Sequence, residues 1–192
     1  GPLHQPRNRL RLLHTADLHM GSDIYPREAI AGLDTIVNMA QEHSVDAVLI
    51  AGDLFDASRV SQEIVSYTFD SLGKVGRPVV ILPGNHDTLL TGPSELEWSP
   101  PSNVYVLQGN GRNVSAIDGL GLSVWGRPVY EHTPEFKPLE GLHPRPNDGW
   151  YVVMAHGLVA DGISTVGRSS LITKEELQQA DCDYIALGHV HR

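Results

Sequence analysis

Five short apolar runs in this chain each lead to a side chain that can bind a metal ion. The runs are Leu10–Leu13, Val45–Ala51, Val79–Pro83, Tyr151–Ala155 and Tyr184–Leu187. The polar side chains that follow them are Asp17 and His19, Asp53, Asn85, His156, and the pair His189 and His191. In open α/β folds, functional sites lie at the carboxyl ends of the strands. The pattern therefore predicts an α/β fold that gathers these side chains at one sheet edge.

The segments between the first runs are predicted to be helical. Apolar residues recur at helical spacing over Glu28–Gln41 and over about Ser61–Leu72. Strands that alternate with helices indicate parallel βαβ units. Three later β-rich segments, which we expect to form an antiparallel part or a second sheet, are Val104–Leu107, Asn113–Ile117 and Leu122–Trp125. The spacing of Thr173 and Glu176 is that of a capping box and predicts a short helix before the last strand.

The composition bounds the fold and leaves the substrate open. With 192 residues, the chain is long enough for one domain with a real core, with or without an insertion. Its formal net charge of −9 argues against a broad basic face for nucleic acid. Two bound divalent cations would change this charge to −5 and would make the site itself attractive to phosphate. Charge alone thus favours neither a DNA substrate nor a small phosphate ester.

The termini and the cysteine content lead to further expectations. No segment approaches the roughly 20 apolar residues of a membrane span, and no signal peptide is visible, so no membrane association is expected. Cys182 is the only cysteine, which fits a reducing cytoplasm. Gly1 and Pro2 are expected to be a remnant of expression, and the domain to cover residues 10–192. Because the chain stops at Arg192, directly after the last histidine pair, we expect it to be truncated at its C-terminus.

The seven donors combine carboxylate and amide oxygens with imidazole nitrogens. Without cysteine, such a set suits Mn²⁺, Fe²⁺, Zn²⁺ or Ni²⁺. Asp17 and His19 stand two positions apart and can face one ion, whereas Asp53 can bridge two ions through its carboxylate. Two ions about 3.5–4 Å apart acidify a water molecule and neutralise phosphoryl oxygens. The residues therefore predict a binuclear centre for the hydrolysis of phosphoesters.

Phosphoester hydrolysis also needs an acid that protonates the leaving oxygen. His86 stands beside Asn85 and is not needed as a ligand, so we expect it to be this acid. A carboxylate must orient the imidazolium and hold it charged. Asp56 is the preferred partner, and Asp87 is the alternative.

Taken together and in order, five sequence blocks resemble the calcineurin-like metallophosphoesterase superfamily. The blocks are Asp17–His19, Gly52–Asp56, Gly84–Asp87, His156–Gly157 and Gly188–His191. Within the superfamily, the residues His14–Gly21, Ala51–Asp56 and Ala186–His191 are most similar to those of the SbcD-type DNA-repair nucleases. Any one block is a weak signal, whereas the complete set is highly specific.

The resemblance implies a fold, a ligand set and partners. The fold would be a two-sheet β-sandwich flanked by helices, and the cofactors two divalent metal ions, with Mn²⁺ the usual ion and Fe, Zn, Ni or Mg as alternatives. The ligands of one ion would be Asp17, His19, Asp53 and His191. Those of the other would be Asp53, Asn85, His156 and His189, with His86 as the catalytic histidine paired to Asp56. The resemblance also implies a homodimer, an SMC-like ATPase partner, and C-terminal strands that this chain lacks.

Three functions remain open on the sequence. The first is a nuclease that hydrolyses DNA, as an exonuclease or endonuclease of DNA repair. The second is a phosphoesterase for nucleotides or cyclic nucleotides, and the third is a truncated metal-binding scaffold without turnover. The Pro- and Gly-rich stretch His132–Gly149 is expected to be a surface loop. If it formed a long ordered lid over the site, a small substrate would be favoured.

Several residues are expected to have structural roles. Each donor taken singly could be a turn or capping residue, because Asp and Asn favour such positions. His14 lies inside an apolar run, so we expect it to pack and hydrogen-bond rather than bind metal. Trp98 and Trp125 could stack on bases, but packing in the core or a loop is the preferred interpretation.

Overall fold

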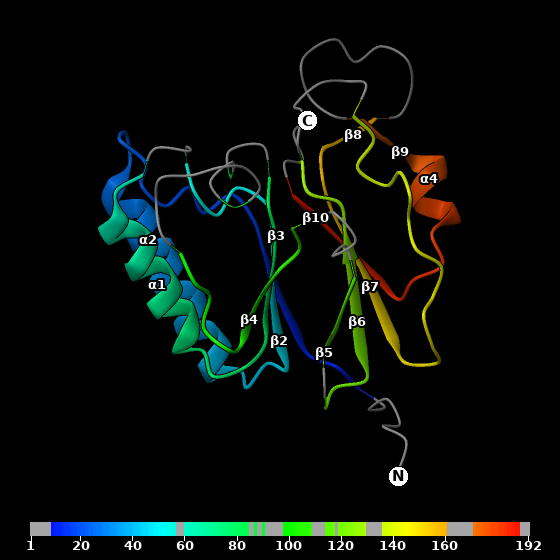
Figure 1. Cartoon of the computed structure of the whole chain (residues 1–192), viewed down its shortest axis with the longest axis horizontal. Coiled ribbons are helices and arrows are strands. Elements are labelled where there is room, and N and C mark those ends of the chain that lie inside the picture. The colour runs from blue at the N-terminus through cyan, green and yellow to red at the C-terminus, as the bar shows by residue number, and fades with distance from the viewer. Residues whose placement is uncertain are drawn as a thin grey trace.

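The apolar runs form strands in two facing β-sheets that have helices on their outer sides (Figure 1). The computed structural model describes residues 9–56, 60–84, 87, 90, 98–108, 114–117, 119–129, 136–160 and 171–188. Helices α1 (Pro26–Glu42) and α2 (Gln62–Gly73) cover the outer face of one sheet, and α4 (Lys174–Gln179) lies beyond the other. This arrangement confirms the predicted α/β class with a two-sheet core flanked by helices.

The first sheet is parallel and has the strand order β1-β2-β3-β4. Its strands are β1 (Leu12–Thr15), β2 (Ala47–Ala51), β3 (Val79–Leu82) and β4 (Val104–Val106). Helix α1 connects β1 to β2, and α2 connects β2 to β3, as predicted for βαβ units. The chain therefore leaves β1, β2 and β3 at the same edge of the sheet.

The position of β4 corrects one prediction. Val104–Leu107 was expected in an antiparallel part, but β4 pairs parallel with β3, with Val104 opposite Val79. Val104 packs on the helical side of this sheet, and Leu107 packs between the two sheets. The local sequence predicts a strand here, but its direction depends on the neighbour against which these side chains are buried.

The second sheet has the strand order β10-β7-β6-β5. Its strands are β5 (Val114–Ile117), β6 (Leu122–Gly126), β7 (Trp150–His156) and β10 (Tyr184–Gly188). Only β5 is antiparallel to its neighbour, as predicted, and β6, β7 and β10 run parallel. The pair β8 (Leu158–Ala160) and β9 (Leu171–Thr173) forms a small separate sheet before α4. Helix α4 begins at Lys174, where the spacing of Thr173 and Glu176 predicts a helix start.

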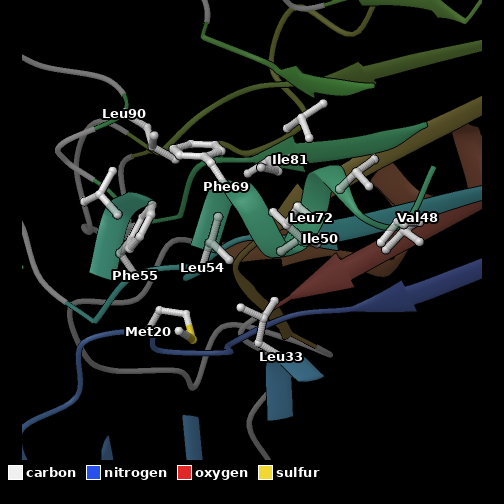
Figure 2. Packing of buried hydrophobic residues seen from close by; sticks show 14 of the residues in the cluster. Met20, Leu33, Val48, Ile50, Leu54, Phe55, Phe69, Leu72, Ile81 and Leu90 are labelled. Carbon is white, nitrogen blue, oxygen red and sulfur yellow. The ribbon is translucent and has the colours of Figure 1, made fainter. Parts of the chain in front are cut away.

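Alternation along the strands divides the core into layers. In β2, Val48 and Ile50 point toward α1 and α2, whereas Leu49 faces the second sheet. Figure 2 shows the cluster on the helical side, where Leu33 of α1 and Leu72 of α2 meet the strand residues. The cluster between the sheets includes Leu49, Val80, Leu82, Val124, Val152 and Met154. Since β2 is covered on both faces, all five of its residues are buried, which explains its continuous apolar run.

Both long helices lie within two residues of their predicted bounds. Helix α2 begins after Ser61, whose hydroxyl oxygen accepts a hydrogen bond of 3.2 Å from the backbone N–H of Ile64. Helix α1 begins with Pro26, a favoured first helical residue. The residue before it, Tyr25, makes no side-chain capping hydrogen bond.

His14 ties the edges of the two sheets together. Its Nε2 lies 3.1 Å from the Leu187 carbonyl oxygen and its Nδ1 lies 2.9 Å from the Tyr184 hydroxyl. Because a carbonyl can only accept, Nε2 donates, and Nδ1 accepts from the hydroxyl. Burial lowers the pKa of His14, in keeping with this neutral ring. The predicted structural role of His14 is confirmed.

The two tryptophans considered above also pack as expected. Trp98 stacks on Phe69 with ring centroids 5.8 Å apart. Trp125 is buried in the cluster on the outer face of the second sheet.

The structure describes the predicted loop His132–Gly149 from residue 136 onward. This part of the loop packs against the protein with buried side chains and does not lie only on the surface. Phe136 and Leu139 are buried, and Leu139 and Leu142 join the cluster on the outer face of the second sheet. Residues 132–135 lie outside the described part. Among the described residues, no helix combines the length and apolarity that a membrane span requires.

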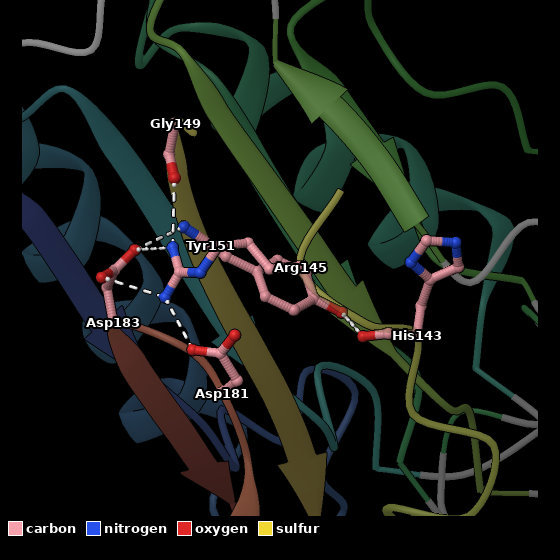
Figure 3. A network of polar contacts seen from close by, with 6 residues as sticks. All are labelled: His143, Arg145, Gly149, Tyr151, Asp181 and Asp183. Carbon is pink, nitrogen blue, oxygen red and sulfur yellow. Dashed lines mark hydrogen bonds and ion pairs between the residues drawn. The ribbon is translucent and has the colours of Figure 1, made fainter. Parts of the chain in front are cut away.

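Arg145 anchors the end of this loop to the second sheet (Figure 3). Its guanidinium donates to Asp183 at 2.9 Å and to Asp181 at 3.3 Å. The Asp183 carboxylate also accepts the backbone N–H of Tyr151 at 2.8 Å, so one carboxylate joins the loop, β7 and the start of β10. The hydrogen bond from Arg145 is the main reason that the pKa of Asp183 is lowered.

Arg145→Ala is expected to lower the free energy of unfolding by about 1 kcal/mol at pH 7, because the ion pairs are partly exposed. A carboxyl whose pKa is lowered by folding stabilises the fold above its unfolded pKa and loses this effect as the pH falls through its folded pKa. The difference between wild type and variant should therefore shrink between about pH 5 and pH 2. Urea unfolding across this range measures it, and a difference that does not change with pH would contradict this assignment.

Candidate metal centre

The loops after β1 and β2 run side by side and hold each other through backbone hydrogen bonds. The N–H of Asp17 donates to the Gly52 carbonyl at 2.9 Å, and the N–H of His19 donates to the Asp53 carbonyl at 3.0 Å. Two further bonds, from Met20 to Leu54 and from Asp56 to Met20, continue the pairing. The next side chains, Leu54 and Phe55, are fully buried in the helical-side cluster (Figure 2). The core therefore anchors both loops.

Three candidate ligands hold a backbone conformation that residues with side chains rarely adopt. Asp17, His19 and Asp53 have φ values of 58°, 52° and 54°. Such left-handed residues cost free energy and cluster at functional sites, where the surrounding structure fixes them. Here the paired loops supply that constraint.

The structure brings Asp17, Asp53 and His156 together. One donor atom from each lies within 4.8 Å of the others. Asp53 and His156 are almost completely buried, whereas Asp17 is exposed. Two carboxylates at this distance repel each other unless a cation lies between or beside them. Carboxylate oxygens with an imidazole nitrogen form a fitting donor set for Mn²⁺, Fe²⁺, Zn²⁺ or Ni²⁺.

The ring of His156 is held in the orientation that a ligand needs. Its Nδ1 lies 2.9 Å from the Ala51 carbonyl oxygen, to which it must donate. This leaves Nε2 directed at Asp53, 3.3 Å from Oδ2. Burial opposes a charged ring, but the hydrogen bond and charge of Asp53 outweigh it and raise the pKa of His156. A backbone carbonyl on the second ring nitrogen is one of the common ways in which proteins orient a metal-binding histidine.

Gly52 lets the His156 ring approach the loop after β2. It has a φ of 96°, and a Cβ at this position would overlap the His156 ring. Gly84, at the end of β3, is similar, since its Cβ would lie 2.6 Å from Asp53 Oδ1. The loop after β2 therefore packs closely against His156, and the loop after β3 packs closely against Asp53.

Gly52→Ala is expected to weaken Mn²⁺ binding at least tenfold, because the new methyl group displaces the His156 ring. Gly76→Ala is the matched control, since Gly76 also has a positive φ, of 70°, but has open space around the position of a Cβ. Both variants carry the backbone strain of alanine at positive φ. Titration calorimetry with Mn²⁺ separates them. If both variants bound Mn²⁺ equally weakly, backbone strain, and not displacement of the His156 ring, would explain the loss of affinity.

Asp56 lies beside His19. Its Oδ1 is 3.3 Å from His19 Nδ1. His86, the histidine that Asp56 was expected to orient, lies outside the described residues, as do the expected ligands Asn85, His189 and His191. The described structure thus places both Asp56 and His19 on the paired loops next to the three-residue cluster.

Asp87, the alternative partner for His86, has a structural role. It is fully buried and accepts the backbone N–H groups of Phe55 at 2.7 Å, Gly84 at 2.8 Å and Leu54 at 3.2 Å. Burial raises the pKa of Asp87 to about 7, although these donors favour the carboxylate. Asp87 therefore ties the loop after β3 to the loop after β2. This role could not be predicted from local sequence, because the contacts of Asp87 with Leu54 and Phe55 join residues more than 30 positions apart.

A groove of about 400 Å³ begins at the paired loops. The residues that line it are Asp17, Leu18, His19, Ser22, Ile24, Tyr25, Glu28, Ala29 and Asp56. None of the described residues 136–149 lines the groove, so this part of the loop is not a lid over it. The part of the groove formed by residues 22–29 was not predicted from the sequence.

Several known proteins are similar to this chain. The family model of the calcineurin-like phosphoesterases matches residues 10–192. The uncharacterized metallophosphoesterase YhaO of Bacillus subtilis (strain 168) is 27% identical over 210 residues, a match that covers 95% of this chain and 49% of YhaO. The SbcD component of nuclease SbcCD from the same organism is 24% identical over 233 residues, covering 95% of this chain and 57% of that protein. The chain thus spans about half the length of these two relatives.

Two further similarities cover smaller shares of the chain. The SbcD component of nuclease SbcCD from Escherichia coli (strain K12) is 36% identical over 89 residues, which is 43% of this chain and 22% of that protein. Among solved structures, the crystal structure of Pseudomonas putida nuclease MPE matches with a TM-score of 0.37 and 19% identity. That match covers 77% of this chain and 61% of the other.

Proposed function

The chain belongs to the calcineurin-like phosphoesterase family, and from this we propose that it is a metal-dependent phosphodiesterase that hydrolyses DNA. The observation that carries the proposal is the cluster of Asp17, Asp53 and His156 donors within 4.8 Å, of which Asp17 also lines an open groove. A divalent metal centre beside a groove of this kind suits the hydrolysis of a negatively charged ester.

We propose a complete centre for two ions. Its ligands would be Asp17, His19, Asp53 and His191 for one ion, and Asp53, Asn85, His156 and His189 for the other. Mn²⁺ is the proposed native ion. When bound, the ions supply positive charge to the phosphoryl oxygens and acidify the attacking water. Asp53 would serve both positions, and the Ala51 carbonyl keeps Nε2 of His156 directed at the site.

The remaining chemistry is assigned to His86 and Asp56. Water that has lost one proton to solvent would attack phosphorus, the bond from phosphorus to the leaving oxygen would break, and the His86 imidazolium would donate its proton to that oxygen. Asp56, on the paired loops, would help to hold the proton donor charged. Because it lies 3.3 Å from His19, Asp56 would also orient that ligand.

The charge of the groove explains why metal is needed for binding as well as for catalysis. Among its described lining residues are three carboxylates, Asp17, Glu28 and Asp56, and no lysine or arginine. Such a surface repels a phosphodiester until cations neutralise it. We therefore expect DNA binding to depend on divalent metal.

DNA is proposed as the substrate because two of the relatives are named nucleases. The described residues 136–149 leave the groove uncovered, which suits a long substrate. By the same similarity we propose a homodimer and an SMC-like ATPase partner for the whole protein. We also propose a role in DNA repair and, since Cys182 is the only cysteine, a cytoplasmic location.

The test compares substrates with Mn²⁺ present and with EDTA. Single- and double-stranded DNA should be degraded, and a panel of nucleotides and cyclic nucleotides should react more slowly. Asp53→Asn protein purified in parallel is the control for contaminating nucleases. Faster hydrolysis of the small substrates would instead identify a nucleotide phosphoesterase. Failure of the metal-loaded protein to hydrolyse even bis(p-nitrophenyl) phosphate would identify a scaffold without turnover.

A further inference from the structure

The groove beside the metal centre has an apolar part, formed by Ile24 and Tyr25 and called the wall below. Ile24 and Tyr25 line the groove together with Asp17 and His19, so the wall and the candidate ligands belong to one cavity. Ile24 is 78% exposed and Tyr25 is 63% exposed, the highest values among the large apolar side chains of the described residues. Single exposed apolar residues are common, but two neighbours that line the same groove as candidate ligands indicate a binding surface.

The side chain of Tyr25 does not cap the helix that follows it, α1. Tyr25 occupies the N-cap of α1, where Ser, Thr, Asp or Asn would satisfy a backbone N–H of the first turn. Tyr25 makes no such capping bond, in contrast to Ser61 at the start of α2. Residues that break a local rule without a structural gain are expected at functional sites.

The backbone fixes Tyr25 relative to the metal centre. The N–H of Tyr25 donates to the Ser22 hydroxyl oxygen at 3.0 Å, and the N–H of Ser22 donates to the carbonyl of His19 at 3.1 Å. Pro26 restricts the chain immediately after Tyr25. The aromatic ring is therefore carried on a short segment of turns that starts at a candidate ligand.

The residues around the wall indicate which part of a substrate lies against it. Glu28 and Asp56 would repel a second phosphate, so the wall is suited to the uncharged part of the substrate. Tyrosine rings bind planar heterocycles by stacking, and this stacking depends little on which base is present. An adjacent aliphatic side chain such as Ile24 extends the apolar contact.

We propose that Tyr25, flanked by Ile24, is a platform on which a nucleobase next to the scissile phosphate stacks. This inference rests on the proposed function and makes it more specific: the substrate is recognised through a base as well as through its phosphate. Tyr25 is accordingly a substrate-positioning residue, and the site favours nucleotide substrates whose base is free to unstack.

The test measures binding of two nuclease-resistant phosphorothioate oligomers in Mn²⁺ by fluorescence anisotropy. One is oligothymidylate, and the other has the same length and backbone but carries abasic residues. Tyr25→Ala should raise the Kd for oligothymidylate about tenfold, the loss expected for one stacked base. The same variant should leave the Kd for the abasic oligomer within about twofold of wild type.

Two control variants separate stacking from a structural effect. Tyr25→Phe keeps the ring and should bind both oligomers as wild type does. Tyr67→Ala removes an exposed tyrosine on α2 that does not line the groove, and it should also behave as wild type. An oligomer with 2-aminopurine should lose fluorescence on binding to wild type and to Tyr25→Phe, but not on binding to Tyr25→Ala.

Equal Kd values for wild type and Tyr25→Ala on oligothymidylate would overturn the platform. So would an equal loss on both oligomers, because that would show a general disturbance of the site. The hydrolysis assays above report separately on the proposed function. DNA hydrolysis without base-dependent binding would refute the platform alone, and base-dependent binding without any hydrolysis would refute the nuclease alone.

Discussion

Replacement of Asp53 by asparagine is expected to lower kcat/KM for phosphodiester hydrolysis by roughly 10³-fold and to weaken the binding of both metal ions. Asp53 is 2% exposed and lies in the cluster with Asp17 and His156. Asparagine has nearly the same shape, but it replaces a carboxylate with a neutral amide that has only one oxygen. It cannot offer a charged oxygen to each of two ions.

The fold should survive this change. The carbonyl of residue 53 still accepts the N–H of His19, and the loop remains anchored by Leu54 and Phe55. Metal content by mass spectrometry, circular dichroism and turnover should be measured on the same sample. Asp70→Asn on the exposed surface of α2 is the matched control and should retain metal and activity. Loss of only one ion from Asp53→Asn would argue against a carboxylate shared by both.

His86→Ala is expected to retain both ions while kcat for DNA falls by about 10²- to 10⁴-fold, the range for a general acid. The effect should depend on the leaving group. An alkoxide of DNA needs a proton as the bond breaks, whereas p-nitrophenolate is stable without one. The variant should therefore lose much less activity on bis(p-nitrophenyl) phosphate than on DNA.

Metal content and the ratio of the two rates decide this assignment. His43→Ala, at the exposed C-terminal end of α1, is the control and should change neither rate. If His86→Ala lost metal, His86 would be a ligand rather than the acid. An equal loss of rate on both substrates would also contradict the acid role.

The strands, the helices and the edge that carries the site could be predicted because they follow from local patterns. Apolar runs of four to seven residues with a polar end predicted β1, β2, β3, β7 and β10. Helical spacing predicted α1 and α2 to within two residues. Of the predicted ligands, Asp17, Asp53 and His156 are brought together in the described structure. The roles of Asn85, His86, His189 and His191 remain predictions.

The features that were not predicted depend on partners far apart in the sequence. The direction of β4 is set by β3, and Asp87 is used by backbone groups of another loop. The contact of Asp56 with His19 arises from the pairing of two loops more than 30 residues apart. Tyr25 could have been noticed from one signal, an aromatic residue directly before the Pro26 that begins a helix.

Because the paired loops are anchored in the helical-side core, the affinity for metal should depend on how well that core is packed. Asp53 and Asp56 flank Leu54 and Phe55, which are completely buried against the helices. Because folding has already restricted these loops, an arriving ion has little chain entropy to remove, and an ion that binds only the native state stabilises it by an amount that grows with the ratio of ion concentration to Kd. Conversely, a cavity in the helical-side core would loosen both aspartates at once. Residues that never approach the substrate would then control how firmly the protein holds its catalytic ions.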